Sequence, residues 1–231
     1  MLKIALLGYG KLGRLIEDLA QGQGHSIIAC INSHTPKEKK QEQISLADVC
    51  IDFSVPSVAI EHIKMAAEAK KPIVVGTTGW YEKIDQVEDC IRTHGTACIY
   101  GNFSLGMILF QQIIQSAARL MKYFEQYDIA GHEIHHRHKV DAPSGTAVIL
   151  EDILKKETGR KSIPFSSTRC GSIPGTHTIF LDSPCDTIEL THHARNRSGF
   201  AEGALIAAKW IIGKQGIFTF QELVESHGNV Q

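Results

Sequence analysis

The sequence predicts an α/β fold in which a doubly wound parallel sheet is followed by a second, α+β domain. Three observations support this prediction. In the first hundred residues short apolar runs alternate with longer amphipathic stretches, a glycine-rich turn follows the first run, and after Asn102 the strand-like runs are punctuated by Gly, Pro and Asp. Alternating strands and helices are typical of a parallel sheet, whereas punctuated strands are typical of an antiparallel one.

Five segments of the first hundred residues are short and largely apolar on both faces, as buried strands are. They are Lys3–Leu7, Ser26–Ile31, Val49–Phe53, Ile73–Val75 and Ala97–Tyr100. Three longer segments between them carry apolar residues at helical spacing. These are Lys11–Gln21, Ser57–Lys70 and Glu82–His94. The polar stretch Asn32–Gln43, rich in Lys, Glu and Gln, is interpreted as a solvated loop or a short excursion.

The chain after Asn102 follows a different pattern. The long apolar stretch Leu105–Met121 predicts a helix, and residues 127–134 predict a strand. Later segments predict two antiparallel strands, a helix and a final apolar run, at Thr176–Phe180, Thr187–Thr191, 201–213 and 216–220. We therefore expect a first domain over residues 1–103, a second over 104–212, and a C-terminal tail, 213–231, that returns to the first.

Composition indicates a small ligand and a reducing compartment. The chain has 24 basic and 25 acidic residues, a net charge of -1, so no overall field favours nucleic acid or an anionic membrane as a partner. Its six cysteines lie mostly in apolar runs without a CxxC pair, which predicts reduced, packed thiols. With neither a signal peptide nor a membrane-spanning run in the sequence, we expect a cytoplasmic protein.

The first glycine turn predicts a dinucleotide site. Gly8, Gly10 and Gly13 form G-x-G-x-x-G directly after a predicted strand and at the start of a predicted helix. Such glycines permit a tight turn, let backbone amides approach a pyrophosphate and allow the helix to pack closely on the sheet. This position favours a Rossmann-type, doubly wound sheet over a glycine turn that binds no nucleotide.

The end of the second predicted strand leaves the choice of cofactor open. A carboxylate that binds the adenosine ribose is expected there, but Asn32, Ser33 and His34 occupy the place, followed by Lys37, Lys39 and Lys40. Neutral donors followed by ammonium groups suit a 2'-phosphate at least as well as a free hydroxyl, which makes NADPH, NADH or both acceptable. Alternatively, the lysines are only a solvated surface.

The segment GHEIHHRHKVDAPSGTA, residues 131–147, is the most informative in the chain. It holds four histidines, at 132, 135, 136 and 138. Zinc binding is disfavoured, because a strand through residues 129–136 turns His135 away from His132 and His136, and neither HExxH nor a cysteine pair is present. We predict no metal. A polar surface loop is also a poorer explanation, because the four histidines lie beside Lys139 and the start of a predicted helix.

An acid and anion site explains this segment better. Lys139 offers a point charge to a carboxylate, and neighbouring imidazoles hold charge or donate a proton near neutral pH. Thr146 and the backbone amides around Gly145, at the start of a helix from about Ser144, can bind a second carboxylate. Such a site suits a small dicarboxylate.

At these residues the chain resembles the 4-hydroxy-tetrahydrodipicolinate reductase (dihydrodipicolinate reductase) family. HHRHKVDAPSGTA is similar to the signature segment of that family, and other segments agree in order along nearly the whole chain. They are GYGKLG at 8–13, IDFSVPS at 51–57, VGTTGW at 75–80, GNFSLG at 101–106 and HHARNRSGFAEGAL at 192–205. The resemblance implies NADH- or NADPH-dependent reduction of a cyclic, imine-conjugated dicarboxylate in diaminopimelate and lysine biosynthesis.

The resemblance also implies roles for single residues. His135 and Lys139 match the family's proton-transferring residues, and the substrate-carboxylate contacts match His136, Gly145, Thr146 and Arg197. The segments around the dinucleotide match Gly8, Tyr9, Gly10, Lys11, Leu12, Gly13, Asn32, Gly76, Thr77, Thr78, Tyr100, Gly101, Asn102 and Phe103. It further implies that residues 1–103 bind the dinucleotide, and that 104–212 bind substrate and assemble a homotetramer.

Three other functions are weighed against this one. Another two-domain nicotinamide dehydrogenase would share the glycine turn but lack HHRHKVDAPSGT. A nucleotide sensor or scaffold would bind the dinucleotide without oxidising it when the cyclic imine is supplied. A metal-dependent hydrolase would carry stoichiometric zinc.

Overall fold

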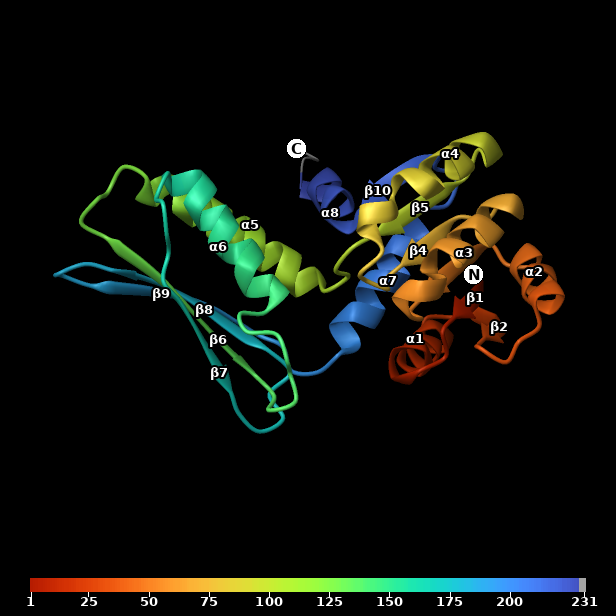
Figure 1. Cartoon of the computed structure of the whole chain (residues 1–231), viewed down its shortest axis with the longest axis horizontal. Coiled ribbons are helices and arrows are strands. Elements are labelled where there is room, and N and C mark those ends of the chain that lie inside the picture. Colours follow the sequence, from red (N-terminus) through yellow and green to blue (C-terminus); the bar gives the residue numbers. More distant parts are fainter. Residues whose placement is uncertain (229–231) are drawn as a thin grey trace. The chain divides into compact units, whose positions relative to one another are not determined.

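The computed structural model of the chain describes residues 1–228 and forms two compact units. Unit 1 comprises residues 1–105 together with 198–228, and unit 2 comprises residues 106–197. The chain therefore leaves unit 1 once and returns to it, as expected. Most helices and strands of both units are labelled in Figure 1.

Unit 1 is built on a parallel sheet of six strands in the order β10-β5-β4-β3-β1-β2, and all its neighbours pair in parallel. The strands are β1 (Lys3–Leu7), β2 (Ser26–Ile31), β3 (Val49–Asp52), β4 (Ile73–Val75), β5 (Ala97–Tyr100) and β10 (Gly216–Thr219). Every residue of β3 and β4 is buried. Since successive residues of a strand point to opposite faces, both faces of the sheet are covered.

Helices of unit 1 form this cover, and α1 packs against α7 whereas α3 packs against α4. The helical elements are α1 (Lys11–Gly22), α2 (Lys37–Ser45), α3 (Pro56–Glu68), the 3-10 turn η1 (Tyr81–Lys83), α4 (Asp85–His94), α7 (Ser198–Trp210) and α8 (Phe220–Gly228). The architecture is thus the predicted Rossmann-type, doubly wound sheet.

Two predictions about unit 1 are wrong. The polar stretch Asn32–Gln43 is not only a loop, because α2 begins within it at Lys37. The second domain does not extend to residue 212, because α7 packs against α1, β3 and β4 of unit 1. Its buried residues are almost all small, Ala201, Gly203, Ala204, Leu205, Ala207 and Ala208, which lets the helix approach the sheet closely.

Unit 2 is a four-stranded mixed sheet in the order β7-β6-β8-β9, with helices on one face (Figure 1). Its strands are β6 (Asp128–His135), β7 (Phe165–Arg169), β8 (Thr176–Asp182) and β9 (Thr187–His193), and its helices are α5 (Leu105–Met121) and α6 (Gly145–Thr158). Only β6 and β7 pair in parallel. The core between sheet and helices contains Phe110, Ile114, Ile129, Leu150 and Ile179. Unit 2 is therefore α+β, as predicted.

The cysteines are all free, but they do not share one environment. Cys50 and Cys98 are buried in unit 1, where burial raises the pKa of the Cys50 thiol to about 12. Cys170 and Cys185 are exposed, so the prediction of packed thiols is wrong for these two. Cys170 directly follows β7, and Cys185 lies in the turn between β8 and β9.

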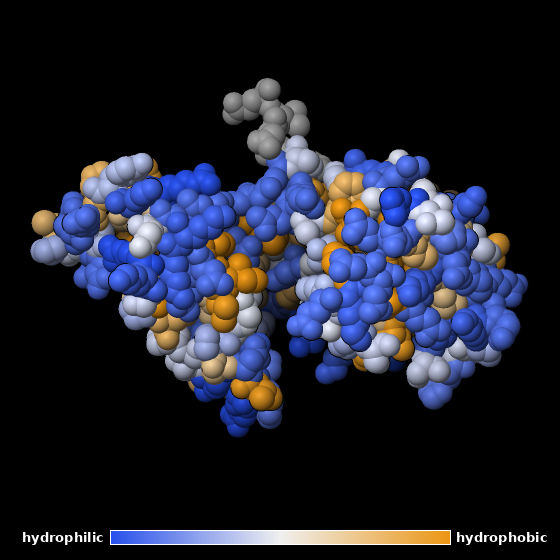
Figure 2. All heavy atoms as spheres, turned by 45° about the horizontal axis from the view of Figure 1, so that its top comes forward, coloured by the Kyte–Doolittle hydropathy of each residue, from blue (hydrophilic) through white to orange (hydrophobic). Residues whose placement is uncertain are grey.

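Polar residues cover most of the face drawn in Figure 2, and apolar residues gather only in small groups. Among residues 1–228, none of the helices combines the length and the apolar character that spanning a bilayer requires.

The close approach of α7 in unit 1 can be tested by Gly203→Ala. A Cβ at Gly203 would lie 1.8 Å from the Phe103 carbonyl oxygen, so we expect the free energy of unfolding of unit 1 to fall by about 1–3 kcal/mol. Urea unfolding followed by tryptophan fluorescence reports on unit 1, because Trp80 and Trp210 both lie there.

Gly22→Ala is the matched control for Gly203→Ala. A Cβ at this position of α1 meets nothing within 4 Å, so alanine should leave stability unchanged or raise it by about 0.4–1 kcal/mol. Equal stability of the two variants would contradict the close packing of α7.

Candidate active site

The turn between β1 and α1 has the geometry of a phosphate-binding loop. Gly8 has φ +91°, and a Cβ there would lie 2.4 Å from the Phe53 carbonyl oxygen. A Cβ at Gly13 would lie 2.5 Å from the Gly8 oxygen. By contrast, a Cβ at Gly10 meets nothing within 4 Å, and no side chain caps the start of α1. The turn is thus closed on the protein side and open where backbone amides can meet an anion.

A cavity of ≈ 230 Å³ lies beside this turn in unit 1. It is lined by Leu12, Phe53, Ser54, Pro56, Gly76, Thr77 and Thr78, four of which were predicted to surround the dinucleotide. These residues follow the carboxyl ends of β1, β3 and β4. In an open α/β sheet, ligands bind at this edge where the strand order reverses, as it does between β1 and β3 here.

A buried carboxylate that the sequence analysis did not identify joins two loops of this edge. Asp52, fully buried at the end of β3, accepts a hydrogen bond from Ser54 Oγ at 3.0 Å and one from the Thr77 hydroxyl. His62 Nδ1 of α3 lies 2.5 Å from the same carboxylate. The only signal in the sequence was a polar residue ending an apolar strand.

The predicted residues at the end of β5 and directly after it also lie at this edge. Gly101 has φ +134°, and Asn102 Oδ1 accepts a hydrogen bond from Ser104 N at 3.0 Å. Phe103 is buried against Phe220, with ring centroids 4.9 Å apart. The Tyr100 ring packs edge-on against the Trp80 ring, and the two ring centroids lie 5.4 Å apart.

The ends of β1 and β2 hold the remaining residues predicted to bind the dinucleotide. Asn32 Oδ1 accepts a hydrogen bond from His34 N at 2.9 Å, so a neutral amide stands at the end of β2. Lys11 begins α1. The Tyr9 hydroxyl donates a hydrogen bond to the Glu17 carboxylate, and this bond raises the pKa of Tyr9 to about 12.

In unit 2, β6 divides the histidine-rich segment between the two faces of its sheet. Glu133 and His135 are buried on the face that carries α5 and α6. His132 lies on the other face, where its Nε2 is 3.0 Å from Thr168 Oγ1. The predicted separation of His132 from His135 is confirmed by this alternation.

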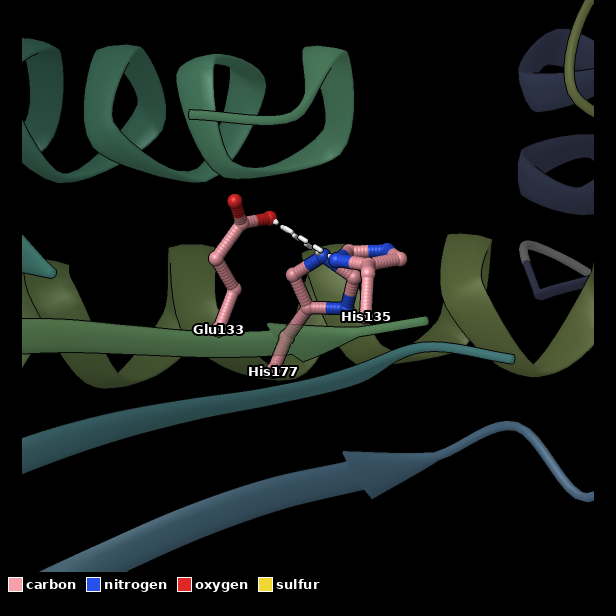
Figure 3. Close-up of side chains that lie close together, drawn as sticks. All are labelled: Glu133, His135 and His177. Carbon is pink, nitrogen blue, oxygen red and sulfur yellow. Dashed lines mark ion pairs between the residues drawn. The ribbon is translucent and has the colours of Figure 1, made fainter. Parts of the chain in front are cut away.

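Strand pairing brings further polar residues to Glu133. Ser167 of β7 and His177 of β8 are its direct cross-strand partners, and His192 of β9 pairs with His177. These four residues form one row across the helix-covered face. Figure 3 shows Glu133, His135 and His177 close together. This row cannot be seen in a local sequence pattern, because it depends on the register between distant strands, although the spacing of Glu133 and His135 places both on one face of a strand.

Glu133 is fully buried yet ionised. Its Oε1 accepts hydrogen bonds from Ser144 N at 2.9 Å, Ser167 Oγ at 2.8 Å and Arg169 at 2.9 Å. Burial by itself raises the pKa of this carboxyl, but the hydrogen bonds outweigh burial and lower the pKa to about 2. The site therefore holds a fixed negative charge.

The two imidazoles beside this charge are buried as well. His135 Nδ1 lies 3.3 Å and His177 Nε2 lies 3.6 Å from Glu133 Oε2. Burial lowers the pKa of both rings, and the neighbouring His135 lowers the pKa of His177 further, to about 4. Near neutral pH, His177 is uncharged.

The loop after β6 carries the other predicted substrate contacts. Lys139 Nζ is 2.8 Å from Asp141 Oδ1. Ser144 caps α6 by accepting a hydrogen bond from Ala147 N at 3.2 Å, so Gly145 and Thr146 lie in the first turn, as predicted. His136 directly follows β6 and is half-buried.

Two other residues singled out in the sequence lie at the surface. His138 is exposed in the same loop, and Arg197 is exposed between β9 and α7.

Glu133, His135 and His177 also offer one potential metal-ligand atom each, all within 4.8 Å of one another. The metal site disfavoured from the sequence involved only the histidines of one segment. This group instead combines two strands, and its carboxylate already binds the Arg169 guanidinium.

The buried, uncharged state of His177 predicts how stability depends on pH. Unfolded histidine titrates near 6.5 and folded His177 near 4, so the unfolded chain binds the extra proton as pH falls between these values. Stability is therefore lost on acidification, by about 2 kcal/mol between pH 7 and pH 5 for this residue. In His177→Gln, urea unfolding followed by circular dichroism should show a loss smaller by that amount.

The exposed His138→Gln is the control and should keep the pH dependence of the unsubstituted chain. If His177→Gln loses as much stability as His138→Gln over this range, His177 is not held uncharged.

Comparison with known proteins gives a consistent family. Residues 2–103 match the family model described as dihydrodipicolinate reductase, N-terminus, and residues 106–224 match dihydrodipicolinate reductase, C-terminus. The 4-hydroxy-tetrahydrodipicolinate reductase of Christiangramia forsetii is 37% identical over 96% of this chain and 98% of its own. That of Methanoregula boonei is 39% identical over 77% of this chain and 74% of its own.

Solved structures agree on the fold. A dipicolinate-bound dihydrodipicolinate reductase from Paenisporosarcina sp. TG-14 superposes with a TM-score of 0.80 at 20% identity, covering 96% of this chain and 99% of its own. At that identity the likeness concerns the fold alone, whereas the two family models together cover nearly all of the chain. The chain belongs to the dihydrodipicolinate reductase family.

Proposed function

We propose that the chain reduces 4-hydroxy-tetrahydrodipicolinate to tetrahydrodipicolinate with NADH or NADPH, in diaminopimelate and lysine biosynthesis. The observation that carries the proposal is the segment at residues 135–147, where a buried imidazole, an ammonium group and a helix N-terminus follow one another in a chain of this family. The relative from Paenisporosarcina is described as dipicolinate-bound, which supports a small cyclic dicarboxylate as ligand.

The edge of unit 1 fits a dinucleotide. The open space at Gly10, the uncapped start of α1 and the cavity lined by Gly76, Thr77 and Thr78 suit a pyrophosphate and the groups next to it. When bound, the reduced nicotinamide supplies a hydride. The residues that would hold it are those at the ends of β1, β2, β4 and β5.

Unit 2 supplies charge and proton transfer. As electrons move onto the conjugated imine, preorganised cations stabilise the change, and we assign this role to Lys139 and protonated His135. Thr146, with the Gly145 amide at the positive end of α6, binds one substrate carboxylate. His136 and Arg197 are assigned to the substrate as well, which fixes the ring for reaction.

The proposal includes a homotetramer assembled through the second sheet. In unit 2, α5 and α6 cover one face of that sheet, and no element of the described chain in this unit covers the other (Figure 1).

The function is tested by a coupled assay with a dihydrodipicolinate synthase, run once with NADH and once with NADPH. We expect oxidation of both cofactors, because no carboxylate at the end of β2 repels a 2'-phosphate. Asn32→Asp keeps an acceptor for His34 N but adds a charge, so the ratio of kcat/KM for NADH to that for NADPH should rise about tenfold. No oxidation of either cofactor by the unsubstituted chain would refute the reaction.

The role of Lys139 is tested by Lys139→Ala. Loss of a preorganised charge near the reacting atoms should lower kcat by about 10²-fold or more and leave the cofactor affinity unchanged. Lys161→Ala, which removes an exposed lysine of the same unit, is the control and should keep full turnover. Unchanged steady-state kinetics of Lys139→Ala would contradict the assignment.

A further inference from the structure

Glu133 is a buried ionised group to which the proposed reaction assigns no task. It lies at the centre of the sheet in unit 2, fully buried, next to the candidate proton-transfer residue. A carboxylate in such a place needs several donors to remain ionised, and an apolar residue would pack the position without them. Its presence therefore calls for a functional explanation.

The two oxygens of Glu133 have different surroundings. Oε1 is saturated by Ser144, Ser167 and Arg169, which fixes the orientation of the carboxylate. Oε2 is buried and receives no hydrogen bond from these donors. Of the two imidazoles beside Oε2, His135 lies closer, with its Nδ1 at 3.3 Å, and that ring atom is also buried without a hydrogen-bond partner. The acceptor and the ring nitrogen thus complement each other.

His177 is the weaker competitor for this oxygen. Its Nε2 lies 3.6 Å from Glu133 Oε2 and only 3.3 Å from Ser144 Oγ. Because Ser144 Oγ accepts from Ala147 N, its own hydroxyl proton remains to be donated to His177. His135 is therefore the ring that can donate a hydrogen bond to Oε2.

We propose that Glu133 is a positioning residue that keeps the proton of neutral His135 on Nδ1, so that Nε2 is the atom that exchanges a proton with the substrate. The inference rests on the proposed function for the identity of the substrate only. When Nε2 takes up a proton, the ring becomes a cation beside the fixed carboxylate, and when Nε2 gives it up the Nδ1 proton stays in place.

Other charges around His135 limit the alternatives. Lys139 and Arg169 disfavour its protonated form, and Glu133 and Asp141 favour it. His177 and, behind it, His192 are the remaining titratable groups on the helix-facing row. A divalent metal ion held by Glu133, His135 and His177 would be opposed by the guanidinium at 2.9 Å from the same carboxylate, which favours the hydrogen-bonded arrangement.

The first test needs no substitution at Glu133. Histidine side chains labelled with ¹⁵N distinguish the two neutral tautomers by NMR, and His135→Asn assigns the signal. We expect His135 to carry its proton on Nδ1 in the purified chain above its pKa. The opposite tautomer would overturn the proposal, whether or not the chain reduces the cyclic imine.

The second test is Glu133→Gln, which keeps the shape and removes the charge. Because Glu133 raises the pKa of His135, the limb of the kcat–pH profile that reports this histidine should move to lower pH. We expect kcat to fall about 10²-fold, with KM for both substrates within about twofold. A purely structural role would lower the active fraction without moving the profile.

Ser167→Ala is the matched control, since it removes one donor to Oε1 and keeps the carboxylate. It should leave the pH profile in place. Should Glu133→Gln not fold, as circular dichroism would reveal, the tautomer measurement decides alone. One equivalent of bound metal in the active protein, with activity lost to a chelator, would overturn the proposal in favour of a metal site.

Discussion

The burial of one ionised carboxylate organises the candidate site in unit 2. Glu133 remains charged only because donors from the adjoining strand β7 and from the start of α6 converge on a single oxygen. The hydrogen bond from Ser144 N fixes where α6 begins, and hence where Gly145 and Thr146 present the positive end of the helix. The loop that carries Lys139 runs from the end of β6, the strand that holds Glu133, to this fixed start of α6.

Unit 1 uses the same construction on a different sheet. Asp52 ends a central strand, is fully buried, and binds hydroxyl groups from the β3–α3 loop and from the segment after β4. These two segments line the cavity beside the glycine turn. In each unit a buried acid thus fixes loops that border the proposed ligand site, where tight packing would close the surface. Rigid loops lose less entropy when the ligand binds.

Local pattern predicted the strands of the parallel sheet almost to the residue, because burial on both faces leaves an unbroken apolar run. The helix α2 was missed since KEKKQEQIS has no apolar face and is polar nearly all round. The assignment of α7 to the second domain was wrong for another reason. Its pattern predicts a helix but does not say which sheet that helix packs against. Similarly, HHRHK predicted the site of His135, whereas the row through Ser167 and His177 depends on strand register.

The row also explains why the proposed proton exchange falls to a single residue of this cluster of buried ionisable groups. Hydrogen bonds hold the pKa of Glu133 near 2, and burial holds the pKa of His177 near 4, so neither changes its charge near neutral pH. The pKa of His135 is also lowered by burial, but the Glu133 charge opposes that effect. The three interacting groups thereby differ in charge. Glu133 is a fixed anion, His177 is a neutral ring, and His135 is the ring that can be protonated beside the anion. Separation of pKa values between neighbours is how a site divides acid, base and spectator roles among similar side chains.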